Sequence, residues 1–255
     1  MKSVAVISAS GSPGTTVTSL LLGMGLREPL TAIELSQTGG TIAGLCGLRW
    51  QPGGVDLAAA AATAGEVTSS MLAQHAQHPP SGVPVVVGPS NAIEAVGAAK
   101  VLTPLLVRSL RQSSGSGVLI ADCGLLGPSS LLWSLAVTTD VTLVVVRSDC
   151  DQGETAARVF HARALADALA QNGAHLGLVV VGDDVRAVAG QVRLPLVASI
   201  PVRPEMVAAV KVGIPERDRA GVGKVTEQLA TRSRALAEAA RSRVVANTRA
   251  MGAAG

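Results

Sequence analysis

Aromatic side chains are nearly absent from this chain of 255 residues, which has no tyrosine, one phenylalanine and two tryptophans. Proteins that bind RNA or single-stranded DNA commonly stack the bases on clusters of aromatic rings. Because the sequence offers no such cluster, it predicts no stacking platform for nucleic acid bases.

Cysteine and histidine are also scarce. The three cysteines, Cys46, Cys123 and Cys150, are too few and too far apart for a disulfide framework or a four-ligand zinc site. The four histidines have no ligand spacing with a carboxylate on a shared helix face. We therefore expect no metal-cluster partner, and a reducing cytoplasm as the environment.

Long apolar runs are missing as well, although 48% of the residues are hydrophobic and the mean hydropathy is +0.42. Glycine, proline and serine interrupt every run before the roughly 18 apolar residues that a membrane span needs. The first 26 residues resemble a signal peptide, but residues 10–16 interrupt the apolar stretch and no small-residue cleavage site follows. We expect a cytoplasmic protein, with peripheral association at the membrane or nucleoid as the alternative location.

Positive charge is concentrated at the C-terminal end. From Lys211 onward there are nine Lys or Arg against four Asp or Glu, so this part carries +5 and the rest of the chain −2, which gives the total of +3. A solvated basic helix explains this pattern, and contact with nonspecific DNA or an anionic membrane is the alternative. The thin apolar stripe along this helix favours packing on the domain or against a partner helix.

Seven short runs of apolar, mostly β-branched residues alternate with longer segments rich in alanine and leucine. This order is typical of right-handed βαβ units, which build a mainly parallel sheet with helices on both faces. We therefore predict an α/β domain over residues 1–215, followed by a linker and a basic helix over residues 216–255. The predicted strands cover residues 4–7, 31–35, 83–87, 117–121, 141–146, 176–181 and 196–200.

The glycine-rich turn after the first strand leads directly into a predicted helix. Such a turn points backbone N–H groups and the positive helix end at one place, which suits a phosphate. In a standard P-loop, G-x-x-x-x-G-K-[ST], the lysine reaches the β- and γ-phosphates. Here Thr15 stands at the lysine position and Thr16 remains as a magnesium ligand. The motif alone equally supports a structural turn, in which Gly11 and Gly14 permit the bend and Thr16 caps the helix.

Three segments together resemble the MinD/ParA family of P-loop proteins. Residues 10–17 are similar to its deviant Walker A loop, K-G-G-x-G-K-T-T, with Ser10 and Thr15 at the two lysine positions. Residues 31–48 resemble its first switch segment, where Glu34 and Ser36 fall on the two carboxylates of D-x-D. Residues 118–127 resemble its second switch, with Asp122 at the position that binds the magnesium-water shell. With later segments over residues 140–149 and 194–215, the likeness extends from about residue 4 to residue 215.

The resemblance implies a binding site for ATP and Mg²⁺ that is weakened or lost. Thr16 and Asp122 are the magnesium ligands if a nucleotide binds, and no residue is assigned a catalytic role. The residues that the resemblance places at the cofactor are Gly11, Ser12, Pro13, Gly14, Thr15, Thr16, Val17, Glu34, Asp122 and Gly124.

The departures from the family pattern concern the residues that bind and hydrolyse nucleotide. Ser36 cannot orient an attacking water as the family's second carboxylate does, and Ser10 cannot reach a neighbouring nucleotide as the signature lysine does. Gly182 lies where the family places an asparagine that reads adenine. Losing two charge-assisted lysine contacts removes about 3–6 kcal/mol of binding free energy, or on the order of 10²–10⁴ in affinity. Lys2, Arg49 and Arg147 are the cations that could compensate.

Three functions follow from these observations. The first is a non-hydrolysing localisation, partitioning or assembly adaptor of the MinD/ParA type that binds a protein partner and forms a homodimer through the face bearing the loops. The second is an active ATPase with a noncanonical P-loop. The third is a partition protein that binds nonspecific DNA through its basic C-terminal helix.

Overall fold

The computed structural model describes residues 1–11, 14–112, 117–149, 151–214 and 216–252. Its centre is a parallel sheet of seven strands in the order β3-β2-β4-β1-β5-β6-β7. The strands are β1 Ser3–Ser8, β2 Leu30–Glu34, β3 Val85–Val86, β4 Val118–Leu125, β5 Val141–Arg147, β6 Leu176–Val181 and β7 Leu196–Ile200.

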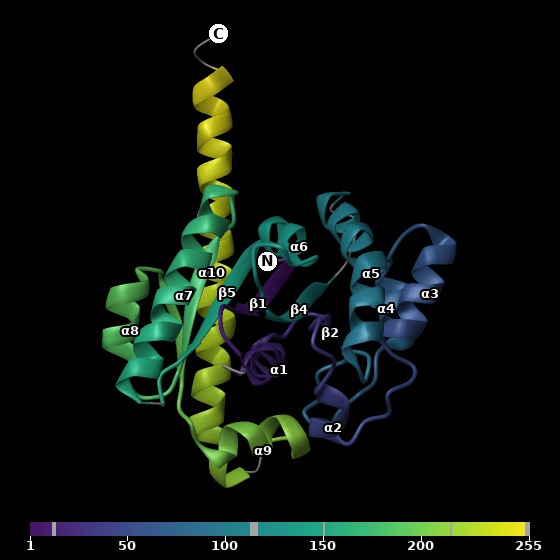
Figure 1. Cartoon of the computed structure of the whole chain (residues 1–255), viewed down its shortest axis with the longest axis horizontal. Helices are drawn as coiled ribbons and strands as arrows, with labels where there is room; N and C mark the ends of the chain where they lie inside the picture. The colour runs from purple at the N-terminus through teal and green to yellow at the C-terminus, as the bar shows by residue number, and fades with distance from the viewer. Residues whose placement is uncertain (12–13, 113–116, 150, 215, 253–255) are drawn as a thin grey trace.

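Helices cover both faces of the sheet (Figure 1). One face packs against α3 Gly54–Ala64, α4 Ser69–His75, α5 Ala92–Gln112, α6 Trp133–Thr138, α7 Gln152–Gln171 and α8 Val185–Val192. The other face packs against α1 Thr15–Gly25, α2 Ile42–Cys46, α9 Pro204–Val212 and α10 Arg219–Gly252, and a short 3₁₀ helix, η1, spans Glu216–Asp218.

The central strand β1 shows why the strands are apolar along their whole length. Its side chains alternate between the two cores: Ala5 and Ile7 lie in one, and Val4 and Val6 lie in the other, all fully buried. Because both faces of a parallel sheet are covered by helices, neither set of alternating positions is left for polar residues. The predicted α/β class and parallel sheet are confirmed.

All seven predicted strands are present; three differ from the predicted bounds by one residue at one end or both, and two differ by more. The strand predicted over residues 83–87 is only Val85–Val86, because β3 is an edge strand that pairs with β2 at two positions. The strand predicted to end at residue 121 continues to Leu125, because β1 pairs with it as far as Leu125 across a register shift. Asp122 therefore lies within β4 and not in the following loop.

The C-terminal helix α10 runs along the second face of the sheet. We expected residues 216–255 to begin with a linker, but α10 already begins at Arg219. Burial of Val222 and Val225 against the domain outweighs the low helix propensity of the glycines beside them. The buried positions among the described side chains of this helix are Val222, Val225, Thr226, Leu229, Ala230, Ser233, Ala237 and Ala240.

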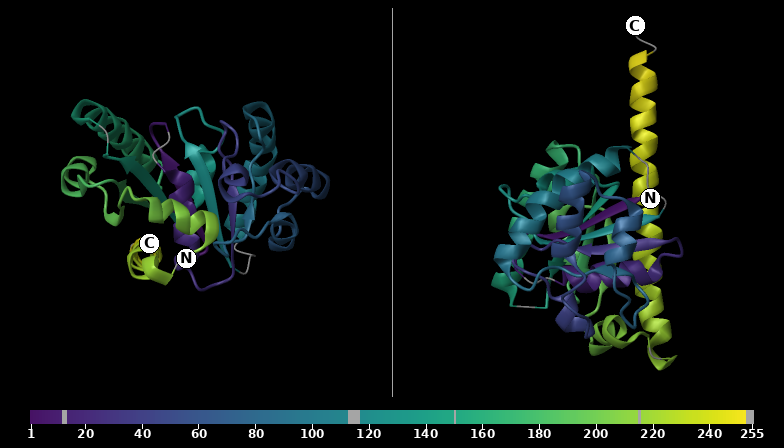
Figure 2. Two further views of the ribbon diagram at one scale, coloured as in Figure 1. Left: turned by 90° about the horizontal axis from the view of Figure 1, so that it is seen from below. Right: turned by 90° about the vertical axis from the view of Figure 1, so that its right-hand side faces the viewer.

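Close contact between α1 and α10 depends on a glycine. A Cβ atom at Gly25 would lie 2.1 Å from the carbonyl oxygen of Thr226, so only glycine fits at this crossing. Packing of the first part of α10 on the domain, one of the two interpretations of the apolar stripe, is confirmed. The last turns of α10 extend beyond the sheet (Figure 2). Within the part of the chain that the structure describes, no helix is long and apolar enough to cross a membrane.

Candidate functional site

The loop after β1 enters α1 through a left-handed glycine. Gly14 has φ of +92°, and Thr15 is the first residue of the helix. Gly11 is exposed, with open space around its Cα, and the predicted site residues Ser12 and Pro13 lie outside the described residues. The strand-to-helix turn expected from the sequence is therefore present at Gly14.

Thr15 and Thr16, which follow the turn, interact with Asp122. The Thr16 hydroxyl donates a hydrogen bond of 2.6 Å to Asp122 Oδ2, and the backbone N–H of Gly124 donates one of 3.2 Å to Asp122 Oδ1. Thr16 therefore does not cap α1 with its side chain, contrary to the structural alternative considered from the sequence, because its hydroxyl turns toward β4. The neighbouring order β2-β4-β1 places the carboxyl ends of these strands side by side.

Asp122 is a buried carboxyl group without a cation among the groups that act on it. Only 1% of the residue is exposed. Burial, and then the negative charge of Glu34, raise the pKa of Asp122 to about 7, while hydrogen bonds from Thr16, Gly124 and Thr15 oppose the rise. Near neutral pH a substantial fraction of this carboxyl group is therefore protonated.

Glu34 is also buried, but its carboxylate binds the surrounding backbone. Its Oε1 accepts hydrogen bonds from the backbone N–H of Thr41 at 2.5 Å and of Ile42 at 3.1 Å, and its Oε2 accepts one from Gly88 at 2.8 Å. Burial raises the pKa of Glu34, and these donors oppose the rise. The side chain joins the end of β2 to the start of α2 and to the segment after β3. Both carboxylate oxygens of Glu34 therefore accept backbone hydrogen bonds that hold these loops in place.

Ser36 and Gly124 lie where two of the loops approach each other. A Cβ atom at Gly124, whose φ is +59°, would lie 2.8 Å from the Ser36 hydroxyl oxygen. The same hydroxyl is 2.9 Å from the Thr38 hydroxyl. The close approach of β4 to the loop after β2 therefore requires glycine, and Ser36 bonds within its own loop.

A cavity of about 300 Å³, here called the loop-side cavity, opens beside the P-loop-like turn. Gly14 and Val17 line one side of it, and apolar residues from β6, β7 and α9 line the other. Two arginines, Arg147 and Arg203, also line it. Arg147 forms an ion pair with Asp149, and this contact lowers the pKa of that carboxyl group. The cavity combines an apolar surface with positive charge next to the turn.

Gly182 leaves no room for a side chain at the end of β6. Its φ is +129°, and a Cβ atom there would lie 2.5 Å from the Ser148 hydroxyl oxygen. A base-reading asparagine at this position would therefore require a rearrangement of the loop after β5. The structure gives a steric reason for the glycine that the sequence places there.

Of the three cations considered as substitutes for the missing lysines, only Arg147 lies next to the turn. Lys2 lies at the amino end of β1, the end of the sheet away from the turn. Arg49 follows α2, where its backbone groups bond with the Gln77 side chain. Arg147 at the end of β5 lines the loop-side cavity with Gly14.

The oxygen atoms at the end of β4 suit a magnesium ion that also binds a phosphate. Mg²⁺ prefers octahedral oxygen ligands and commonly binds one or two protein groups together with substrate phosphates. Thr16 Oγ1 and Asp122 Oδ2 supply two such atoms, 2.6 Å apart. Within the described ranges, no three His, Cys, Asp or Glu side chains gather as a metal site. The residues fit a shared magnesium ion and form no all-protein metal site.

Sequence reasoning missed the backbone donors to Glu34. Thr41, Ile42 and Gly88 donate backbone N–H groups to its carboxylate. Backbone donors carry no residue signature, because any residue except proline can supply them. Only the spacing of a buried acid from a following helix start could have suggested Thr41.

No protein-family model matches the sequence, and no curated protein matches it either. Solved structures match its fold. The cell division ATPase MinD of Pyrococcus furiosus is 18% identical, covers 92% of this chain and 99% of its own, and has a TM-score of 0.68. A ParA family ATPase from Chlorobium tepidum is 12% identical, with 90% and 98% covered and a TM-score of 0.67. A chain from the MinC:MinD cell division protein complex of Aquifex aeolicus is 13% identical, with 91% and 95% covered and a TM-score of 0.62.

At these identities the likeness concerns the fold. The seven-stranded parallel sheet with helices on both faces is that of the MinD/ParA type of P-loop NTPase. The fold expected from the sequence resemblance is confirmed.

Proposed function

We propose that this chain is a non-hydrolysing adaptor built on the MinD/ParA fold, which acts in localisation, partitioning or assembly through a protein partner. In this proposal the P-loop-like turn is a structural turn or a weak anion site. The loops at the carboxyl ends of β1, β2 and β4 form the face through which the protein pairs with a second copy of itself.

The observation that carries the proposal is the surroundings of Asp122. Where a working P-loop has a lysine, Thr15 begins α1, and among the described residues the donors to the carboxyl group of Asp122 are hydroxyl and backbone groups. A cation beside a carboxylate lowers its pKa, whereas burial without one raises it. Burial, and then the charge of Glu34, raise the pKa of Asp122 to about 7, and a lysine at position 15 would oppose this rise.

The two positions of the D-x-D pair support the absence of hydrolysis. Glu34 is held by the backbone N–H groups of Thr41, Ile42 and Gly88. Ser36 has no carboxylate and bonds with Thr38. Neither side chain is placed to orient a water molecule for attack on a phosphate.

A protein partner fits the fold better than DNA or a membrane does. The Aquifex aeolicus structure of this fold contains MinC with MinD, so the fold supports complexes between proteins. The basic helix α10, in contrast, uses several arginines within the domain. Arg232 donates to the carbonyl oxygen of Leu196, Arg234 pairs with Glu28, and Arg241 pairs with Asp140. These contacts lower the charge that α10 presents to a polyanion.

A phosphate-release assay with saturating ATP and magnesium tests the proposal. We expect the wild-type protein and its Asp122→Ala variant to show the same background rate. A wild-type rate clearly above that of the variant would overturn the assignment as a non-hydrolysing protein.

The second candidate function is an ATPase with a noncanonical loop, and the loop-side cavity favours it. Arg147 lines this cavity beside Gly14, and Thr16 and Asp122 supply oxygens that fit magnesium. This candidate predicts magnesium-dependent nucleotide binding that Asp122→Ala abolishes. Calorimetric titration of both proteins with ATP and magnesium decides it, because unchanged binding in the variant would exclude this role of Asp122.

A further inference from the structure

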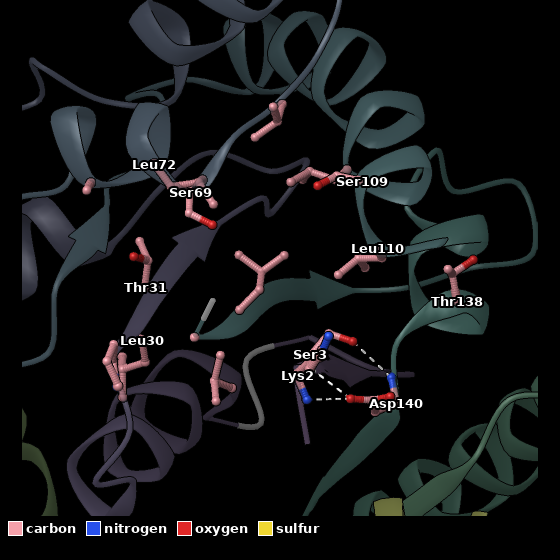
Figure 3. Close-up of a pocket in the computed structure, with 17 residues that line it drawn as sticks. Lys2, Ser3, Leu30, Thr31, Ser69, Leu72, Ser109, Leu110, Thr138 and Asp140 are labelled. Atoms are coloured by element: carbon pink, nitrogen blue, oxygen red, sulfur yellow. Dashed lines mark hydrogen bonds between the residues drawn. The ribbon is translucent and has the colours of Figure 1, made fainter. Parts of the chain in front are cut away.

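A separate cavity of about 300 Å³ lies at the amino ends of β1, β2 and β4 (Figure 3). We call it the amino-end cavity. The carboxyl ends of these three strands lead to the P-loop-like turn, Glu34 and Asp122. Their amino ends contribute Ser3, Thr31 and Leu119 to this cavity. Helices α4 and α5 form its sides. It therefore does not belong to the site at the loops.

Most of the wall is apolar. Leu119 from β4 and Leu106 from α5 are buried, and Leu72 from α4 faces the same space. Leu110 of α5 also lines the cavity and is partly exposed. A surface of this kind favours an occupant that removes apolar area from water.

Five residues of the described wall carry hydroxyl groups, and those of Ser3 and Thr138 already form hydrogen bonds within the protein. Ser69 and Ser109 come from α4 and α5, on opposite sides of the cavity, and Thr31 comes from β2 (Figure 3). Their hydroxyls form no hydrogen bond with any other described residue. Each can therefore donate to or accept from a bound molecule without breaking a contact within the protein.

The ionisable residues on the described lining carry opposite charges that sum to zero. Lys2 and Asp140 are the only ionisable side chains on the described wall of this cavity. The Asp140 carboxylate accepts hydrogen bonds from the backbone N–H groups of Lys2 and Ser3, the second at 3.1 Å, and is 3.3 Å from the Arg241 guanidinium. The described lining therefore has no excess of either charge, and a charged ligand would lose its hydration without meeting a surplus of opposite charge.

We propose that the amino-end cavity binds an uncharged, mainly apolar small molecule that carries a hydrogen-bonding group. Its volume is at the lower end of the range of small-molecule pockets, about 300–1,000 Å³. The apolar wall holds the body of the molecule, and the hydroxyls of Thr31, Ser69 and Ser109 orient its polar group. This site is independent of nucleotide binding at the loops.

The test uses 1-aminoanthracene, a neutral fluorescent probe, titrated with the full-length protein. We expect a saturable fluorescence increase with one site per chain. Ala73→Trp places a large side chain at the exposed rim of the cavity and should weaken binding at least about tenfold. Ala62→Trp is the matched control, since Ala62 is an equally exposed helical alanine in α3 that does not line the cavity.

A counter-titration with the anionic probe 1-anilinonaphthalene-8-sulfonate tests the predicted preference for an uncharged ligand. We expect this probe not to displace 1-aminoanthracene from the wild-type protein. The proposal would be overturned by the absence of saturable binding, by equal binding in the Ala73→Trp and Ala62→Trp variants, or by displacement at similar concentrations of the anionic probe. Thermal unfolding of each variant confirms that it is folded before the comparison.

Discussion

Returning a lysine to the P-loop-like turn should create measurable nucleotide binding. In the variant Thr15→Lys, the new lysine is the first residue of α1, and its ammonium group lies near Asp122. One charge-assisted contact with a phosphate contributes about 1.5–3 kcal/mol, which corresponds to a gain of roughly 10- to 150-fold in affinity for Mg-ATP. The new cation should also lower the pKa of Asp122 from about 7, so that its carboxylate is ionised and can bind magnesium at neutral pH.

Calorimetric titration with ATP and magnesium measures this gain against the wild-type protein. The matched control is Thr63→Lys, which adds the same charge at an exposed threonine of α3. The reasoning is refuted if Thr15→Lys binds no more tightly than the wild type, or if Thr63→Lys gains as much. In the first case the missing lysine is not what limits affinity, and in the second the gain is a general effect of charge.

Three further predictions concern the stability of the fold. Glu34→Gln should lower the free energy of unfolding in urea by about 1–3 kcal/mol, because an amide leaves at least one buried backbone N–H without an acceptor; a loss below about 0.5 kcal/mol would contradict this. Asp122 binds its proton more tightly in the folded chain, with a pKa of about 7, than in the unfolded chain. Its contribution to stability is therefore complete below about pH 4 and falls by up to about 4 kcal/mol as the pH rises to 7. Asp122→Asn should remove this fall, and parallel pH profiles of unfolding for the two proteins would contradict it. Gly25→Ala should cost about 2–3 kcal/mol, since its Cβ would collide with the carbonyl of Thr226, whereas Gly44→Ala, with open space around it, should not destabilise the protein in the same urea assay.

The sheet could be predicted from the sequence because its strands are buried on both faces. Residues 141–146, for example, are apolar at nearly every position, and the structure has β5 at Val141–Arg147. The extent of β3 and β4 could not be predicted, because strand ends depend on pairing with neighbours that are distant in sequence. The start of α10 was missed for a similar reason, since burial against α1 sustains a helix through glycines that indicate a linker locally.

The candidate site was only partly readable from the sequence. The resemblance placed Thr16 and Asp122 at one site, and the structure brings their oxygens to 2.6 Å. Backbone N–H groups hold Glu34, and this could not be predicted because such donors have no characteristic residue type. It also could not separate Arg147 from Lys2 as a neighbour of the turn, since that distinction depends on which end of the sheet each residue occupies.

In the function that we propose, the fold is retained and nucleotide binding at the loops is lost. Calorimetric titration of the wild-type protein with ATP, ADP and GTP in the presence of magnesium tests it most directly, at protein concentrations that can detect millimolar dissociation constants. We predict no binding tighter than about millimolar, as expected after the loss of two lysine contacts worth about 3–6 kcal/mol. Micromolar binding of ATP would contradict the claim and would make a nucleotide-dependent switch, with Arg147 in place of the missing lysines, the leading interpretation.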